Sequence, residues 1–278
     1  MRLALLILSL SAHALGDGTD AATYAPPETA DGAFFFEPFI GGWSRWRVST
    51  DAEFNGEWKH EEYGSVEGDH GLVVGSAARR HAISTIFDTP FVPEGKGLVV
   101  QYELLTKNAL QCGGAYLKLL SASEELSADG FKAETGYTIM FGPDKCGNTN
   151  KVHFILRHKS PLTGEFEEKH LTSPPLPRLS EKSSHLYTAI VHANNSVAIL
   201  IDGKVVKSAS LLSSEDFAPP VNPPKMIDDP EDLKPDDWID DPKVRAQPRA
   251  HPKRAASHDP PPHTRSLAQM DDPEASKR

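Results

Sequence analysis

The sequence predicts one all-β domain, an antiparallel β-sandwich, followed by an extended proline-rich arm. Short runs of alternating apolar and polar residues recur between residues 34 and 217, and helical periodicity is nearly absent there. More than half of the 23 prolines follow residue 217. Proline lacks an amide donor and fixes φ, so that segment cannot form a central strand or a packed helix.

The strands of the predicted sandwich are short and closely spaced. In chain order they are residues 98–104, 115–120, 137–141, 152–156, 186–191, 197–201 and 205–209. Asp202-Gly203 separates the last two runs, and an Asp-Gly pair between apolar runs is the strongest short-range hairpin signal. A domain of this length buries a substantial core by itself.

The N-terminus has the features of a secretory signal peptide. Arg2 precedes a short apolar run that ends in Ala12-His13-Ala14, a pattern that signal peptidase accepts. We therefore expect a signal peptide over residues 1–16 and a disordered segment over 17–33. The apolar run is about half of the ~20 residues that span a bilayer, so no transmembrane anchor is expected.

The predicted compartment is the secretory lumen, and residues 274–278 show no KDEL-type retrieval signal. In an oxidising lumen the two cysteines, Cys112 and Cys146, are expected to form a disulfide rather than a metal pair or a nucleophile. Asn194-Asn195-Ser196 is a glycosylation acceptor triplet, which weakly supports secretion.

The charge pattern excludes some partners. The formal net charge of −10 argues against nucleic acid, which requires clustered Lys and Arg on one face. Eight acidic residues crowd positions 228–241, which is typical of a solvated acidic loop and also suits divalent cations.

One strand presents a polar face that suits a sugar. Alternation over residues 115–120 puts Tyr116 and Lys118 on one face, and Tyr137 lies beside them if its strand pairs nearby. An aromatic ring stacks on the C–H face of a sugar, while flanking donors and carboxylates bond its hydroxyls. An ordinary solvent-facing strand gives the same spacing.

Three blocks resemble the signatures of the calnexin and calreticulin family, on the calnexin and calmegin side. They are GLVVQYELLTKNALQCGGAYLKLL, YTIMFGPDKC and VHFILRHKSPLTGEFEEKH, at residues 97–120, 137–146 and 152–170. The resemblance runs in order over residues 36–242. It implies a legume-lectin-like, concanavalin-type sandwich over 34–217, and a proline-rich P-domain arm beginning at 218–244.

The acidic unit at 227–234 recurs approximately at 270–277, so residues 245–278 are expected to be a disordered tail with a partial repeat. In the family the arm returns and adds the last strands, a further sugar-contacting carboxylate and a calcium-ligating aspartate. No counterpart of that return is visible, which implies a truncated product. The arm tip is also missing, which argues against a disulfide isomerase-family oxidoreductase as a partner.

The resemblance also assigns residues to the binding sites. The glucose-binding positions fall on Tyr116, Lys118, Tyr137, Met140 and Glu168. The family disulfide falls on Cys112 and Cys146, and Ca²⁺ positions fall on Asp69 and on Pro38 through its backbone carbonyl. Hard oxygen ligands of this kind suit calcium.

The implied function is non-catalytic. We expect a calcium-dependent lectin chaperone that binds monoglucosylated N-glycans and unfolded glycoproteins in the endoplasmic reticulum lumen. The alternatives are a non-lectin calcium-binding protein or an inactive truncated paralogue. A jelly-roll glycoside hydrolase needs two carboxylates about 5 to 9 Å apart. Glu167 and Glu168 are neighbours and point to opposite faces of a strand, which counts against an enzyme.

Overall fold

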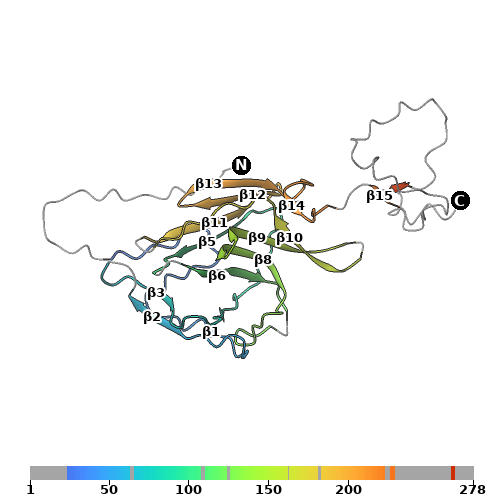
Figure 1. Ribbon diagram of the computed structural model, residues 1–278. Helices are drawn as coiled ribbons and strands as arrows, with labels where there is room; N and C mark the ends of the chain where they lie inside the picture. The colour runs from blue at the N-terminus through green and yellow to red at the C-terminus, as the bar shows by residue number, and fades with distance from the viewer. Residues whose placement is uncertain are drawn as a thin grey trace, which may run out of the picture.

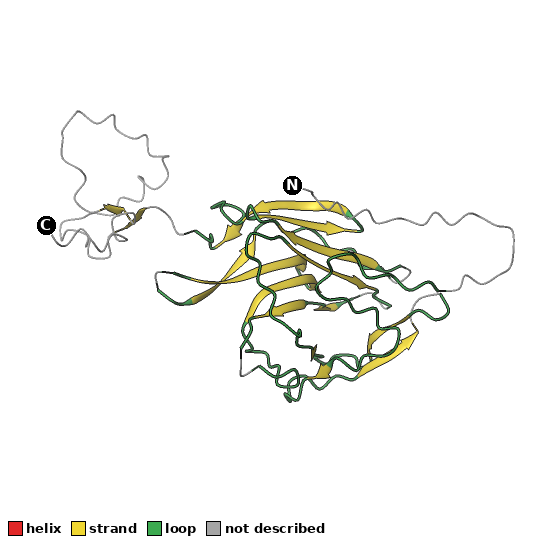
Figure 2. Cartoon of the chain, turned by 180° about the vertical axis from the view of Figure 1, so that it is seen from behind, coloured by secondary structure: helices red, strands yellow, loops and turns green. Residues whose placement is uncertain are grey.

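The computed structural model describes residues 24–62, 66–107, 110–123, 126–161, 163–180 and 183–222, and the backbone of 226–228 and 264–266. Within these ranges the chain forms strands and loops and no helix (Figure 2). All strand pairs are antiparallel, so the predicted all-β antiparallel class is confirmed. No helix in the described part of the chain is long and apolar enough to cross a membrane.

The predicted signal peptide, residues 1–16, lies outside the described residues. So do residues 17–23 of the predicted N-terminal segment, and most of the predicted arm and tail at 218–244 and 245–278. In that last part the structure describes one short antiparallel pair, formed by β15 (Met226–Asp228) and β16 (Thr264–Ser266).

Two antiparallel sheets form the body of the domain and are stacked on each other in Figure 1. The first, which we call the site sheet, has the order β14-β10-β9-β8-β6, with β7 also paired to β8. Its strands are β6 (Cys112–Gly114), β7 (Leu117–Leu120), β8 (Tyr137–Cys146), β9 (Thr149–Lys159), β10 (Phe166–Leu171) and β14 (Phe217–Ala218). The second, the outer sheet, has the order β13-β12-β11-β5. Its strands are β5 (Leu98–Leu104), β11 (His185–Val191), β12 (Ser196–Ile201) and β13 (Lys204–Ser210).

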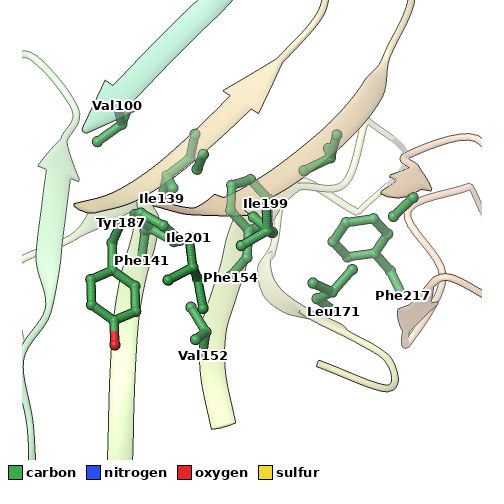
Figure 3. Close-up of a cluster of buried hydrophobic side chains, with 13 residues drawn as sticks. Val100, Ile139, Phe141, Val152, Phe154, Leu171, Tyr187, Ile199, Ile201 and Phe217 are labelled. Atoms are coloured by element: carbon green, nitrogen blue, oxygen red, sulfur yellow. The ribbon is translucent and has the colours of Figure 1, made fainter. Parts of the chain in front are cut away.

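The hydrophobic core lies between these two sheets, as Figure 3 shows. Strand alternation places it there: Val197, Ile199 and Ile201 of β12 are at most 2% exposed, while the intervening residues are partly exposed. Phe141 and Phe154 face them from the site sheet. Each fully buried side chain of this size contributes about 1.5 to 3 kcal/mol to stability. Thus the opposite face of the site sheet is free to carry polar groups.

The predicted hairpin at Asp202-Gly203 is confirmed between β12 and β13. Both residues have positive φ, 53° and 73°, as a type I′ turn requires. The predicted strand 98–104 coincides with β5. The predicted strand 115–120 is shorter than expected, because Ala115 and Tyr116 lie outside β6 and β7.

Asp202 also fixes the hairpin through its side chain. Its carboxylate accepts from the Leu186 amide at 3.0 Å and lies 2.9 Å from His185 Nδ1 and 3.4 Å from Arg178 Nη1. Burial alone would raise the pKa of this carboxyl, but the three contacts outweigh it and hold the pKa below its ordinary value. The stabilisation is therefore complete above the unfolded pKa of about 4 and is lost as pH falls through the folded pKa.

We expect the substitution Asp202→Asn to lower the free energy of unfolding at pH 7 by up to about 1 kcal/mol, since the ion pair of Asp202 with His185 is partly exposed. Asparagine keeps an acceptor oxygen and tolerates positive φ, so the change removes charge alone. Urea unfolding at pH 7 and pH 3 measures it. The difference between variant and native chain should shrink at pH 3, and a constant difference would contradict the assignment.

A smaller N-terminal part lies beside the site sheet, at the lower edge of Figure 1. It contains the pair β1 (Arg47–Val48) with β4 (Ile83–Ser84) and the pair β2 (Trp58–Glu62) with β3 (His70–Val74).

This N-terminal part is tied to the loop between β7 and β8. The Thr50 amide donates to the Asp129 carbonyl at 3.0 Å, and the Ser49 hydroxyl donates to the Phe131 carbonyl. The Ser84 hydroxyl donates to the Ala128 carbonyl in the same loop. These bonds position Phe131 at the edge of the site sheet.

Candidate functional site

Tyr137 and Glu168 form the centre of a polar cluster on the site sheet. The Tyr137 hydroxyl donates to Oε1 of Glu168, and His170 Nε2 lies 3.1 Å from Oε2 of the same carboxylate. Because a carboxylate only accepts, Nε2 of His170 carries the proton of that bond. Burial, and then the bond to Glu168, raises the pKa of Tyr137 above its ordinary value, so the hydroxyl remains protonated.

Lys118 lies over two aromatic rings beside this cluster. Its Nζ is 5.1 Å from the centroid of Tyr137 and 5.7 Å from that of Phe131. Burial lowers the pKa of Lys118, and the charge of Glu168 opposes that shift. An ammonium held over rings, and only partly hydrated, retains N–H donors for a ligand.

Tyr116 lies on the same face at the other end of the site. Its hydroxyl bonds to Asp144, and its ring meets that of His153 edge to face at 5.8 Å. The Tyr116 ring covers Gly114, where an added Cβ would lie 2.1 Å from Cζ of the ring. Glycine at 114 therefore lets the ring lie flat against β6.

His153 and Asp144 form a hydrogen bond beside Tyr116. His153 Nε2 is 3.2 Å from Asp144 Oδ2. Burial lowers the pKa of His153, and the bond to Asp144 opposes the shift. Burial, and then the bond to Asp144, raises the pKa of Tyr116. The cluster therefore offers a protonated phenol and a neutral imidazole at neutral pH.

Strand register explains why these residues meet. Met140 of β8 is opposite Lys118 of β7 and Ile155 of β9, and Ile155 is opposite His170 of β10. Directly opposed residues share a face, so this row runs across four strands. Ile155 is 3% exposed and, with Met140, supplies an apolar floor.

Tyr137 joins the row through an irregularity. The pairing of β7 with β8 shifts between Leu119 and Leu120, so that Leu120 is opposite Tyr137. Strict alternation from Ile139 would turn Tyr137 toward the core. The shift instead lets its hydroxyl reach Glu168.

The structure thus brings together all five predicted sugar-binding residues. Their role in binding stays a prediction. Sequence reasoning missed residues that share the face; strand alternation from Met140 and the pairing of β9 with β8 and β10 could have found them. They are Asp144, His153, Ile155, Arg157 and His170.

Glu168 is opposite Arg157, while Glu167 bonds the buried Lys169, so the two glutamates do point to opposite faces.

The disulfide between Cys112 and Cys146 is present. The two residues are directly opposite each other in the β6–β8 pair. The bond closes β6 onto β8 near Gly114 and so supports the strand against which the Tyr116 ring lies.

The predicted calcium positions lie on two neighbouring segments. The carbonyl of Phe39, next to Pro38, contacts His60 Nε2, and the His60 ring stacks on His70 at 5.3 Å. His70 follows Asp69 directly. Hence the segment that carries Pro38 contacts His60, and the segment that carries Asp69 also carries His70, which stacks on His60.

The donor types at these positions fit calcium, but their number is small. Asp69 bonds the Tyr24 hydroxyl, and burial raises the pKa of the Asp69 carboxyl while that bond opposes the shift. Glu37 already accepts from the Phe39 amide and from Trp46 Nε1. In the ranges that the structure covers, no group of three or more His, Cys, Asp or Glu side chains could hold a metal ion. Calcium takes six to eight oxygens, so the described residues supply part of a site at most.

Comparison with known proteins identifies the family. The model of the calreticulin family matches residues 35–273. The chain belongs to the calreticulin family. It is 52% identical over 235 residues to a calnexin homolog of Aspergillus fumigatus, with 80% of this chain and 41% of the relative covered. It is 47% identical over 220 residues to a calnexin homolog of Pisum sativum and 43% identical over 236 residues to calmegin of Bos taurus. Those matches cover 78% and 80% of this chain and 39% of each relative.

A solved structure supports the fold of this family member. The calreticulin globular domain of T. cruzi matches with a TM-score of 0.60 and 31% identity, covering 76% of each chain. The predicted lectin-like sandwich is therefore confirmed. The chain spans about 40% of the length of the curated relatives it matches.

Proposed function

We propose that this calreticulin-family protein is a non-catalytic lectin chaperone that binds the terminal glucose of monoglucosylated N-glycans on unfolded glycoproteins. One observation carries the proposal: Lys118, Tyr137 and Glu168, which come from three strands, converge on one polar and aromatic cluster. Membership in the calreticulin family supports it.

The cluster has the groups that a neutral polyol needs. A sugar hydroxyl both donates and accepts, and the Glu168 carboxylate has acceptor capacity beyond its bonds to Tyr137 and His170. The Lys118 ammonium supplies donors, and the Tyr116 hydroxyl, whose proton is donated to Asp144, can accept a hydrogen bond at a separate point. The rings and the Met140 thioether give the sugar C–H groups an apolar surface. A single pyranose in this position can therefore be bonded at its edge and packed on its face.

The proposed compartment is the lumen of the endoplasmic reticulum. Disulfides such as Cys112–Cys146 persist in oxidising compartments, and the pattern at residues 1–16 is that of a signal peptide. Glycoproteins that still carry glucose on their N-glycans are the partners proposed there. The proposal does not include an oxidoreductase.

Calcium enters the proposal as a structural ion. We assign Asp69 and the Pro38 carbonyl as two of its oxygen ligands, because both donor types suit calcium and their segments pack on the same histidine pair. Bound there, the ion would neutralise the partly buried Asp69 carboxylate and stabilise the N-terminal part.

The test is calorimetric titration of the full chain with a glucose-capped high-mannose oligosaccharide and with the same oligosaccharide lacking glucose. We expect binding of the capped form alone, and tighter binding with calcium than with chelator. Glu168→Gln should weaken binding about tenfold or more, since a hydrogen bond to a charged group is worth about 1.5 to 3 kcal/mol. Glu165→Gln, an exposed change of the same charge in the same hairpin, should not.

Equal affinity for the two oligosaccharides would exclude glucose as the recognised group. No binding by a chain with native circular dichroism would leave the inactive paralogue as the better account. Calcium-independent binding would remove the ion from the proposal and leave the lectin function standing.

A further inference from the structure

The turn between β11 and β12 carries a feature that sugar binding does not use. The triplet Asn194-Asn195-Ser196 is the only Asn-x-Ser/Thr sequence in the 278 residues in which x is not proline. Asn194 and Asn195 are exposed at the tip of the hairpin, and Ser196 begins β12. The triplet is therefore accessible in the folded domain.

The side chains of the triplet face each other. Asn194 Oδ1 accepts from the Ser196 amide at 3.0 Å and from the Ser196 hydroxyl at 2.7 Å. Asn195 has φ of 65°, and its amide donates to the His192 carbonyl at 2.9 Å, which closes the turn. Among the described residues, none hydrogen-bonds Nδ2 of Asn194. The amide nitrogen is thus left open to solvent.

This arrangement matters because an amide nitrogen is a weak nucleophile. Two donors on Oδ1 stabilise the negative charge that develops on oxygen when Nδ2 loses a proton. The hydroxyl that supplies one donor is the group that distinguishes the acceptor triplet from other Asn-x sequences. An aspartate at 194 would make the same two bonds and fix the same turn, so the structural role alone does not require asparagine.

We propose that Asn194 is a site of N-linked glycosylation. The co-substrate is an oligosaccharide linked to a polyprenyl pyrophosphate, as is usual for this modification in the secretory lumen. Nδ2 bonds to C1 of the sugar, the C1–O bond to pyrophosphate breaks, and the polyprenyl pyrophosphate leaves with the electron pair. One amide proton passes to a base of the transferase. The inference rests on the lumenal location proposed above.

The fold accommodates a bulky glycan at this position. The turn belongs to the outer sheet, whereas Lys118, Tyr137 and Glu168 belong to the site sheet. The Asn195 carbonyl accepts from the Leu211 amide at 2.9 Å, so the backbone of the turn is held independently of the Asn194 side chain. A glycan here would project from a hairpin tip and leave the proposed lectin site open.

The experiment uses the full chain, expressed with its own N-terminus in eukaryotic cells. The purified protein is treated with peptide-N-glycosidase in ¹⁸O water and digested. The mass of the peptide that contains residue 194 is then measured by mass spectrometry. We expect conversion of Asn194 to ¹⁸O-labelled aspartate in the native chain and in Ser196→Thr. We expect none in Ser196→Ala, which lacks the hydroxyl, or in Asn194→Asp, which keeps the turn.

The redox state of Cys112 and Cys146 is measured in the same samples. It shows whether a negative result contradicts the glycosylation inference alone or also the lumenal location. An unmodified Asn194 in a chain with the disulfide formed overturns the inference and leaves the lumenal location standing. An unmodified Asn194 with both thiols free overturns both. Labelling that persists in Ser196→Ala would also overturn it, because deamidation rather than a glycan would then explain the mass.

Discussion

Replacing Lys118 with methionine should weaken binding of the glucose-capped oligosaccharide about 10- to 100-fold. The ammonium lies over Tyr137 and Phe131, where the side chain is partly buried, and a hydrogen bond from a charged donor is worth about 1.5 to 3 kcal/mol. Methionine keeps most of the length of the side chain and an apolar group beside both rings. The loss should therefore appear in affinity and not in the thermal midpoint.

Two further measurements test that explanation. Lys204→Met removes the same charge from an exposed position on the outer sheet and should leave affinity unchanged. Burial lowers the pKa of Lys118, so binding by the native chain should decline as pH rises toward the ordinary lysine pKa, 10.5, and Lys118→Met should lack that dependence. Unchanged affinity in Lys118→Met would remove this residue from the site.

Removal of the disulfide should have the largest effect on stability. Cys112 and Cys146 are 34 positions apart, and cross-linking a loop of that length reduces the entropy of the unfolded chain. We expect the double variant Cys112→Ala/Cys146→Ala to lose about 3 to 4 kcal/mol of unfolding free energy, measured by urea denaturation.

The native chain in reductant is the matched control and should unfold at nearly the same urea concentration as the double variant. A loss below about 1 kcal/mol would mean that the bond between Cys112 and Cys146 restricts the unfolded chain little, or that other contacts compensate. Sugar affinity should fall by less than in Lys118→Met, because the disulfide touches the site only through the β6 backbone beneath Tyr116.

Much of the fold could be predicted from local pattern. The alternating runs correspond to β5, β8, β9 and β11–β13, and Asp202-Gly203 forms the expected hairpin, because each signal depends on residues close in sequence. The interruption before β7 could not be predicted in this way. There Gly142 has φ of 148°, and an added Cβ would lie 2.1 Å from the Ala115 carbonyl oxygen. That close approach depends on two strands, and no single window of sequence contains both.

The candidate site likewise contains residues that a local pattern predicts and residues that only strand pairing places. Tyr116 and Lys118 were placed on one face by alternation, which is a local rule. Tyr137 reaches Glu168 through the register shift at Leu119 and Leu120, and a shift in pairing leaves no mark in either strand alone. Asp144 was missed because its partner, His153, comes from the next strand.

The loop that carries Phe131 is held by residues far away along the chain. Ser49 and Thr50 bond this loop 82 and 79 positions before the residues they contact. Contacts at such separation require the N-terminal part to dock before the aromatic support of Lys118 is complete. A substitution at Ser49 would therefore act on the candidate site through Phe131 and Lys118. The proposed affinity for a sugar would thus depend on the docking of two stretches of the chain that are distant in sequence.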